Sequence, residues 1–266
     1  MHRSGTSLIT HWLSQCGLQV GECLLGDAPS NVDGHFEDLE FLRIHEEILV
    51  SNNLPPTGLI DDKGINISIY QMEKLKSIIR VKNRLYTQWG WKDPRTCLFL
   101  DTYRELFSRS KYLVIVRDYQ SVISSLLKRD FSDIDRKYER RGFFTRIIWT
   151  YFRRNRRKQK FYKNNAEYYL KVWIAYNEHI LNMLKELLQG DYIVVNYSLI
   201  GKCDKKVFSL LTNGWGFALQ YFPFKEVFKE NLMSKPIDLN PYINNTALVA
   251  EAESLENAFQ LYMSPC

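Results

Sequence analysis

The first residues of the chain combine the groups that an anion-binding turn needs. In the run Arg3-Ser4-Gly5-Thr6-Ser7, Arg3 carries a fixed positive charge, Gly5 lets the backbone approach a ligand closely, and the hydroxyls stand at the start of an apolar helical pattern. The free N–H groups at a helix N-terminus favour negative charge. This turn therefore predicts a cradle for a phosphate or a similar anion.

A phosphate-binding turn also suggests a kinase or NTPase. The P-loop of those enzymes, G-x-x-x-x-G-K-[ST], has a lysine directly before the hydroxyl residue. Here Thr6 stands in that position, and no predicted strand ends in an acidic residue that would complete a Mg²⁺ site. An ATP- and Mg²⁺-dependent P-loop phosphotransferase is thus the weaker alternative, and no metal is expected.

Two further polar motifs follow predicted strands. Lys92-Asp93-Pro94-Arg95 comes after a short strand expected at 86–91, and Arg117 comes after a continuous β-branched and aromatic run at 111–116. Ser125 follows Arg117 by eight residues, on the next predicted helix. Ligands of parallel α/β sheets bind at the carboxyl ends of the strands, so both motifs are expected at the ligand-binding edge.

Helical and strand patterns alternate along the chain. Apolar spacing predicts helices over 8–16, 39–49, 68–81, 98–107, 122–127 and 166–188, with further helices near 205–211 and 248–261, and strands over 86–91, 111–116 and 191–196. Such alternation is typical of βαβ units. We expect an α/β fold with a central parallel sheet flanked by helices, in a single domain over residues 1–266.

Several residues have both a structural and a functional interpretation. His45 is expected on the flank of the second helix. Trp173, Tyr176 and Asn177, on the long helix, are expected to pack in the protein core. For Asp93 and Arg95 a local ion pair and a cofactor role are equally compatible with the sequence.

The positive charge is concentrated in one segment. From Arg136 to Lys163 there are twelve Lys or Arg residues and one acid, a charge of +11, whereas the whole chain carries +6 and the remainder therefore −5. This asymmetry indicates a local anionic partner and argues against a nucleic-acid-binding surface over the whole domain. We interpret residues 130–163 as a basic, aromatic insertion.

Aromatic residues stand beside the cationic run within 142–158. This combination suits an interfacial helix on an anionic membrane surface. The alternative is a solvated basic helix that packs its aromatic side chains on the domain.

The cysteines and the hydropathy indicate the compartment. Five cysteines are scattered without a C-x-x-C pair, so neither a disulfide framework nor a zinc site is expected. No stretch approaches the roughly 20 apolar residues that a membrane span needs. We expect a cytoplasmic protein, peripheral at the inner membrane surface if 142–158 binds lipid.

Taken together, the motifs resemble sulfotransferases that use 3′-phosphoadenosine 5′-phosphosulfate (PAPS). The resemblance rests on the order and spacing of Met1–Leu8, Gly34–Asp38, Trp91–Arg95, Val116–Asp118 with Ser124–Leu126, and Trp173–Asn177. It implies a three-layer P-loop-like fold. It also implies that Arg3, Ser4, Gly5, Thr6 and Ser7 wrap the 5′-phosphosulfate of the donor, while Arg117 and Ser125 bind its 3′-phosphate. A non-catalytic nucleotide-binding relative is a second alternative.

Sulfuryl transfer requires that the departing phosphate oxygen is neutralised and that the proton of the acceptor is taken up. We assign the first role to Arg3, supported by Lys92 if the strand before Lys92 lies beside the cradle. Glu37 is the predicted base and His35 the second candidate; the competing interpretation is that Glu37 or Asp38 merely caps the following helix. The acceptor is expected to be a glycan, a lipid or a small-molecule alcohol, with carbohydrate or glycolipid favoured by the glutamate-type loop.

In the family that these motifs resemble, the cradle follows the central strand of the sheet. We therefore expect that an apolar strand of about five residues precedes Met1 in a longer form of the chain.

Overall fold

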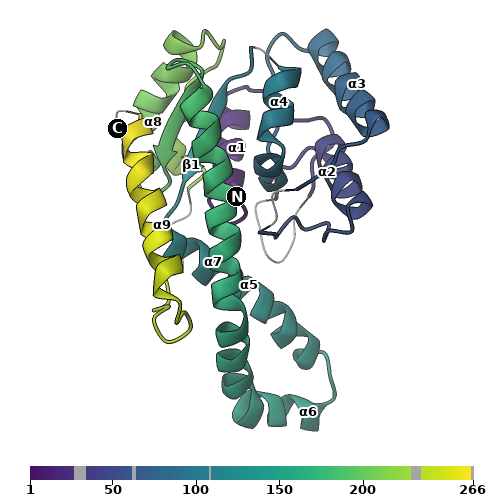
Figure 1. Ribbon diagram of the computed structural model, residues 1–266, viewed down its shortest axis with the longest axis vertical. Coiled ribbons are helices and arrows are strands. Elements are labelled where there is room, and N and C mark those ends of the chain that lie inside the picture. Colours follow the sequence, from purple (N-terminus) through teal and green to yellow (C-terminus); the bar gives the residue numbers. More distant parts are fainter. Residues whose placement is uncertain (27–33, 62–63, 108, 229–234, 265–266) are drawn as a thin grey trace.

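The computed structural model describes residues 1–26, 34–61, 64–107, 109–228 and 235–264, and it is a mixed α/β structure (Figure 1). Its α-helices are α1 (Thr6–Gln15), α2 (Leu39–Ser51), α3 (Ile69–Leu85), α4 (Leu100–Leu106), α5 (Tyr119–Glu139), α6 (Phe143–Ile148), α7 (Arg154–Glu186), α8 (Ile200–Ser209) and α9 (Thr246–Phe259). The strands are β1 (Tyr112–Val116) and β2 (Tyr192–Asn196), and the short 3₁₀ and π segments include η1 (Pro94–Leu98), η2 (Trp149–Arg153), η3 (Leu210–Gly214), η4 (Phe224–Glu226) and η6 (Gln260–Tyr262).

Strands β1 and β2 pair in parallel, with Val114 opposite Val194 and Val116 opposite Asn196. This pairing confirms the two strands predicted at 111–116 and 191–196 and the parallel sheet. The strand expected at 86–91 is wrong, because that segment makes only an isolated bridge between Trp89 and Gln19. Its tryptophans pack with Phe41 of α2 instead, and the Trp91 ring stacks on Phe41 at 4.3 Å.

Helices cover both faces of the two strands, as the continuous apolar runs predicted. Alternate side chains of a strand point to opposite faces. One set packs against α1 and α8, and the other packs against α7 and α9. The first set is Ile115, Ile193 and Val195, and the second is Val114, Val116 and Val194.

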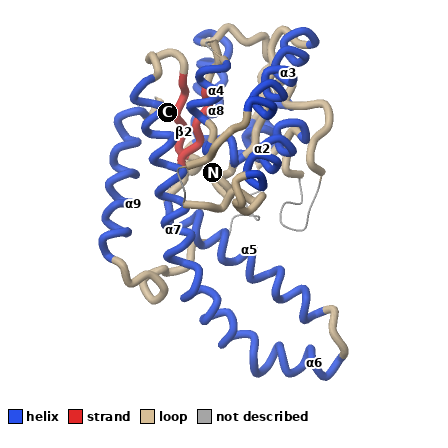
Figure 2. Tube along the Cα trace, turned by 45° about the vertical axis from the view of Figure 1, so that its right-hand side comes forward, coloured by secondary structure: helices blue, strands red, loops and turns tan. Residues whose placement is uncertain are grey.

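The basic segment is helical, which corrects the predicted start of the long helix at 166. Helix α7 begins at Arg154, and α5 extends to Glu139. The cause is a run of arginine, lysine and glutamine, which are good helix formers, with Tyr162 and Ala166 on a buried face. Residues 130–163 form a helical arm that projects from the body in both views (Figures 1 and 2).

Trp149 fixes the turn of the helical arm. Its side chain is buried and stacks on Tyr138 at a ring distance of 3.8 Å. The indole Nε1 donates a hydrogen bond to Asp135 Oδ1 at 3.0 Å, and Asp135 Oδ2 also pairs with Arg154 Nη2 at 2.6 Å. The arm is therefore a packed helical hairpin rather than an extended loop.

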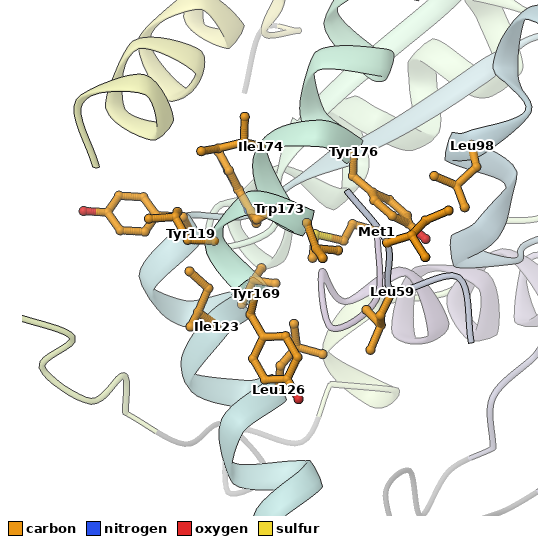
Figure 3. Close-up of a cluster of buried hydrophobic side chains, with 14 of the residues drawn as sticks. Met1, Leu59, Leu98, Tyr119, Ile123, Leu126, Tyr169, Trp173, Ile174 and Tyr176 are labelled. Atoms are coloured by element: carbon orange, nitrogen blue, oxygen red, sulfur yellow. The ribbon is translucent and has the colours of Figure 1, made fainter. Parts of the chain in front are cut away.

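The main core joins the start of the chain to α5 and α7. Met1 is buried near Trp173 and Tyr176 of α7, and Ile123 of α5 belongs to the same cluster (Figure 3). Asn177 is buried and donates from its amide to the Trp173 carbonyl at 2.7 Å. The predicted core role of these α7 residues is confirmed, and the cradle is attached to this core through Met1.

Across the described ranges, none of the helices combines the length and the apolar character needed to cross a bilayer. Cys16, Cys23 and Cys97 are free thiols. Cys203 takes part in a disulfide bond, which the scattered cysteines did not predict.

Candidate active site

The cradle predicted at Arg3–Ser7 lies at the N-terminus of α1. Gly5 is the N-cap with φ of 87°, a left-handed conformation that favours glycine, and Arg3 also has a positive φ of 63°. Within the described part of the chain, no side chain caps α1. The first N–H groups of an α-helix have no partner inside the helix, so this terminus is suited to an anion.

Three predicted residues meet at this terminus from three separate segments. The Arg3 Nε donates a hydrogen bond to Ser125 Oγ of α5 at 2.8 Å. The Arg117 Nη1, just after β1, donates to the Arg3 carbonyl at 2.9 Å. The indole of Trp173 in turn donates to the Arg117 carbonyl at 3.3 Å. The two predicted halves of the site, the cradle and the Arg117–Ser125 pair, are therefore in contact.

The site concentrates positive charge. Burial lowers the pKa of Arg3, and the neighbouring charges of Arg129 and Arg117 lower it further. Guanidinium groups remain protonated in proteins, so these three side chains stay charged. Asp130 is the acidic group that acts on Arg3, and it already accepts from Arg129 Nε at 2.5 Å. Such a cluster favours a bound anion.

Arg129 was missed by sequence reasoning, although a signal for it existed. It lies four residues after Ser125 on α5, and residues at that spacing share one face of a helix. The helical position of Ser125 therefore predicts that Arg129 reaches the same site.

Tyr197 is the second residue that sequence reasoning missed. It directly follows β2, and its N–H donates to the Val116 carbonyl at 2.9 Å, which places it at the carboxyl edge of both strands. Its ring lies against Gly5, and Arg117 Cζ is 4.8 Å from the ring centre. Burial raises the pKa of Tyr197. The general rule that ligands bind at this edge was the available signal.

The predicted base, Glu37, forms a buried ion pair. Lys92 Nζ donates to Glu37 Oε1 at 2.9 Å, and Arg95 Nη1 lies 3.8 Å from Oε2. The cap of α2 is Asp38, whose carboxylate accepts from the Glu40 N–H at 2.9 Å. The capping interpretation is therefore confirmed for Asp38 and wrong for Glu37, whose carboxylate is held by Lys92 and Arg95 instead.

The charges of Glu37 and Lys92 both act on His35. Burial lowers the pKa of its imidazole; the charge of Glu37 opposes this shift, and the charges of Lys92 and Arg3 add to it. The net direction favours the neutral imidazole near pH 7, which is the form that accepts a proton.

Lys92 lies beside Glu37, and the strand that was expected to bring it to the cradle is not formed. Burial lowers the pKa of Lys92, although the charge of Glu37 and its hydrogen bond to Lys92 oppose the shift. The direct contact of Lys92 is with the candidate base rather than with Arg3.

Asp93 and Arg95 form the local ion pair that was one of their two interpretations. Arg95 Nη1 donates to Asp93 Oδ1 at 3.0 Å. His45 is fully buried, and its Nδ1 is hydrogen-bonded to Asp93 Oδ2 at 3.1 Å. Its Nε2 is hydrogen-bonded to the Tyr103 hydroxyl at 2.7 Å. Burial alone would raise the pKa of Asp93, but His45 and Arg95 hold it well below its usual range. His45 is therefore a buried partner of Asp93 rather than a helix-flank residue, and this network fixes the segment that carries Lys92.

No protein-family profile matches the sequence, and no curated protein matches it. Among solved structures, the chain is similar to the "Sulfotransferase Domain from the Curacin Biosynthetic Pathway", with 15% identity over 100% of this chain and 89% of that chain and a TM-score of 0.47.

The contact between Gly5 and Tyr197 makes a prediction about stability. A Cβ at Gly5 would lie 2.1 Å from Tyr197 Cε2, so Gly5→Ala combines a steric clash with a left-handed alanine. We expect this substitution to lower the free energy of unfolding by about 3 kcal/mol. In a Tyr197→Ala background the clash is gone, and the same substitution should cost only about 1 kcal/mol.

Gly17→Ala is the matched control, because Gly17 has φ of 96° but a Cβ added there would meet no atom within 4 Å. Urea unfolding measures the free energy of unfolding of the wild type, the three single variants and the double variant Gly5→Ala, Tyr197→Ala. Equal costs of Gly5→Ala in both backgrounds would show that Tyr197 does not cover the cradle.

Proposed function

We propose that this chain is a PAPS-dependent sulfotransferase that transfers a sulfuryl group to an acceptor hydroxyl or amine. The observation that carries the proposal is the meeting of Arg3, Arg117 and Ser125 at the uncapped start of α1 within the described residues. These are the residues that the resemblance assigns to the two phosphate groups of the donor. A three-layer P-loop-like fold is the finer architecture that we propose around the β1–β2 pair.

The residues present fit a donor with two anionic groups. The N–H groups of Thr6 and Ser7, together with Arg3, would hold the 5′-phosphosulfate, while Arg117 and Ser125 would hold the 3′-phosphate. Charge-assisted hydrogen bonds from arginine to phosphate are stronger than neutral ones, so the arginine cluster supports this assignment.

The reaction requires that the protein stabilises the departing phosphate oxygen and takes up the proton of the acceptor. As the acceptor oxygen forms a bond to sulfur, the bond between sulfur and the phosphate oxygen breaks, and the electron pair stays on that phosphate oxygen. Arg3 and the α1 N–H groups would stabilise the charge that develops there. Glu37 would accept the acceptor proton, with His35 as the second candidate, and Lys92 would hold the Glu37 carboxylate in place.

A glycan or glycolipid is the acceptor class that we propose. It rests on the likeness of the segment Gly34–Asp38 to the loop that carries a glutamate base, and on Glu37 occupying a buried, ion-paired position. The rival functions are an ATP- and Mg²⁺-dependent phosphotransferase and a binding protein that has the fold without turnover.

Calorimetry with adenosine 3′,5′-bisphosphate separates the rivals. We expect binding without added metal, because the arginines supply the positive charge that Mg²⁺ supplies to a nucleotide triphosphate. Arg117→Ala should weaken binding by about 30-fold, since a hydrogen bond to a charged group contributes about 2 kcal/mol.

Arg80→Ala, at an exposed position on α3, is the control and should bind as the wild type does. Binding that requires Mg²⁺, or an Arg117→Ala variant with unchanged affinity, would refute the donor assignment.

Turnover with labelled PAPS and a panel of glycan, lipid and small alcohol acceptors tests catalysis. We expect Glu37→Gln to lower kcat by at least about 100-fold, because it removes the proton acceptor and keeps the side-chain shape. The affinity for adenosine 3′,5′-bisphosphate should stay unchanged. Glu46→Gln is the matched control, since Glu46 also pairs with Arg95 but is half-exposed.

Two results would count against this assignment. A loss of kcat in His35→Ala with normal turnover in Glu37→Gln would move the base to His35. Absence of turnover with every acceptor, combined with normal donor binding, would favour the non-catalytic relative.

A further inference from the structure

The tip of the helical arm exposes large aromatic side chains. Phe144 is 80% exposed, Tyr151 is 78% and Phe152 is 77%. They come from α6 and η2, where the arm turns, at the end farthest from the body (Figures 1 and 2). Exposed apolar residues that gather in this way indicate an interaction surface.

The arm is folded, so the exposure of these three side chains does not result from unfolding. Trp149, in the same turn, is buried against Tyr138 and bonded to Asp135, so the turn has its own packed interior. The π-helical turn at η2 shifts the register of the helix there. Trp149 packs inside the arm, against Phe131 and Tyr138, whereas Phe144, Tyr151 and Phe152 remain exposed.

Cations surround the exposed aromatics. Residues 140–158 contain eight Lys or Arg and no acid. Arg154 is paired with Asp135, whereas Arg153 and Arg156 are exposed and have no ion pair with another described residue. A surface of this kind fits a partner that is apolar inside and anionic at its surface.

A cavity in the same arm adds to this match. It has a volume of about 220 Å³ between α5 and α7 and is lined in part by Phe131, Trp149, Arg157 and Lys160. An aromatic wall with two cations suits the headgroup of an anionic lipid.

We propose that the helical arm docks on an anionic lipid bilayer, with Phe144, Tyr151 and Phe152 in the interfacial region and the arginines at the level of the headgroups. Aromatic side chains favour this depth, and each basic residue near an anionic surface strengthens binding about fivefold. The inference does not depend on the sulfotransferase assignment. For a membrane-bound acceptor, the arm would keep the chain at the membrane that carries the acceptor.

Co-sedimentation of the full chain with vesicles tests the proposal. The vesicles are phosphatidylcholine alone, or phosphatidylcholine with about 30% phosphatidylserine. We expect the wild type to bind the anionic vesicles and to be released as salt rises, because salt screens exposed charges. The triple variant Phe144→Ser, Tyr151→Ser, Phe152→Ser should bind at least about tenfold more weakly.

The charge contribution is tested by Arg153→Gln with Arg156→Gln, which should weaken binding by about 25-fold. Two matched controls lie outside the arm and should bind as the wild type does. They are Ile69→Ser with Tyr70→Ser on α3, which removes side chains 86% and 71% exposed, and Lys202→Gln with Lys206→Gln on α8, where both lysines are exposed.

The variants change exposed positions, and equal thermal midpoints would establish that they fold. The proposal is wrong if the wild type does not bind anionic vesicles, or if the arm variants bind as tightly as the wild type. It is also wrong if the wild type dimerises without lipid and the aromatic triple variant abolishes the dimer, because the arm would then dock on a second copy.

Discussion

The mutual repulsion of the arginines at the N-terminus of α1 is the constraint on which the rest of the site depends. Arg3 is surrounded by the charges of Arg117 and Arg129, and Asp130 compensates only part of them. Like charges that are partly removed from water raise the free energy of the folded chain. A bound anion with several oxygens would relieve this cost, so the same arrangement that destabilises the empty site favours binding.

The fold holds these charges together against their repulsion. Met1 is buried in the core immediately before the cradle, and Trp173 of α7 bonds the Arg117 carbonyl. Strand pairing brings the end of β1 next to the end of β2, so that Arg117 and Tyr197 lie side by side. A second network, buried around Asp93, His45 and Arg95, holds the segment of Lys92 against α2 and Glu37. The anion site and the candidate base thus rest on different parts of the core.

Local patterns predicted much of this structure. The helices near 8–16, 39–49 and 68–81 and the strands at 111–116 and 191–196 are present, because each has a clear apolar period and recognisable ends. The motif order predicted that the cradle and the Arg117–Ser125 pair serve one ligand, whereas the direct hydrogen bond between Arg3 and Ser125 is a finding of the structure. The predictions that failed depended on tertiary contacts. Trp89 and Trp91 pack with Phe41 instead of forming a strand, and His45 is buried in the core, where it is hydrogen-bonded to Asp93. Arg129 and Tyr197 belong to no motif, so their positions, four residues after Ser125 on α5 and directly after β2, were the only signals that they reach the cradle.

The central claim is that the start of α1 and the Arg117–Ser125 pair form one clamp for a single ligand with two phosphates. A crystal structure of the chain with adenosine 3′,5′-bisphosphate is its most direct test. The claim predicts the 5′-phosphate within hydrogen-bond distance of the Thr6 and Ser7 N–H groups and of Arg3, with the 3′-phosphate on Arg117 and Ser125. A nucleotide bound elsewhere, or one that contacts the cradle with both phosphates and leaves Arg117 and Ser125 untouched, would contradict it.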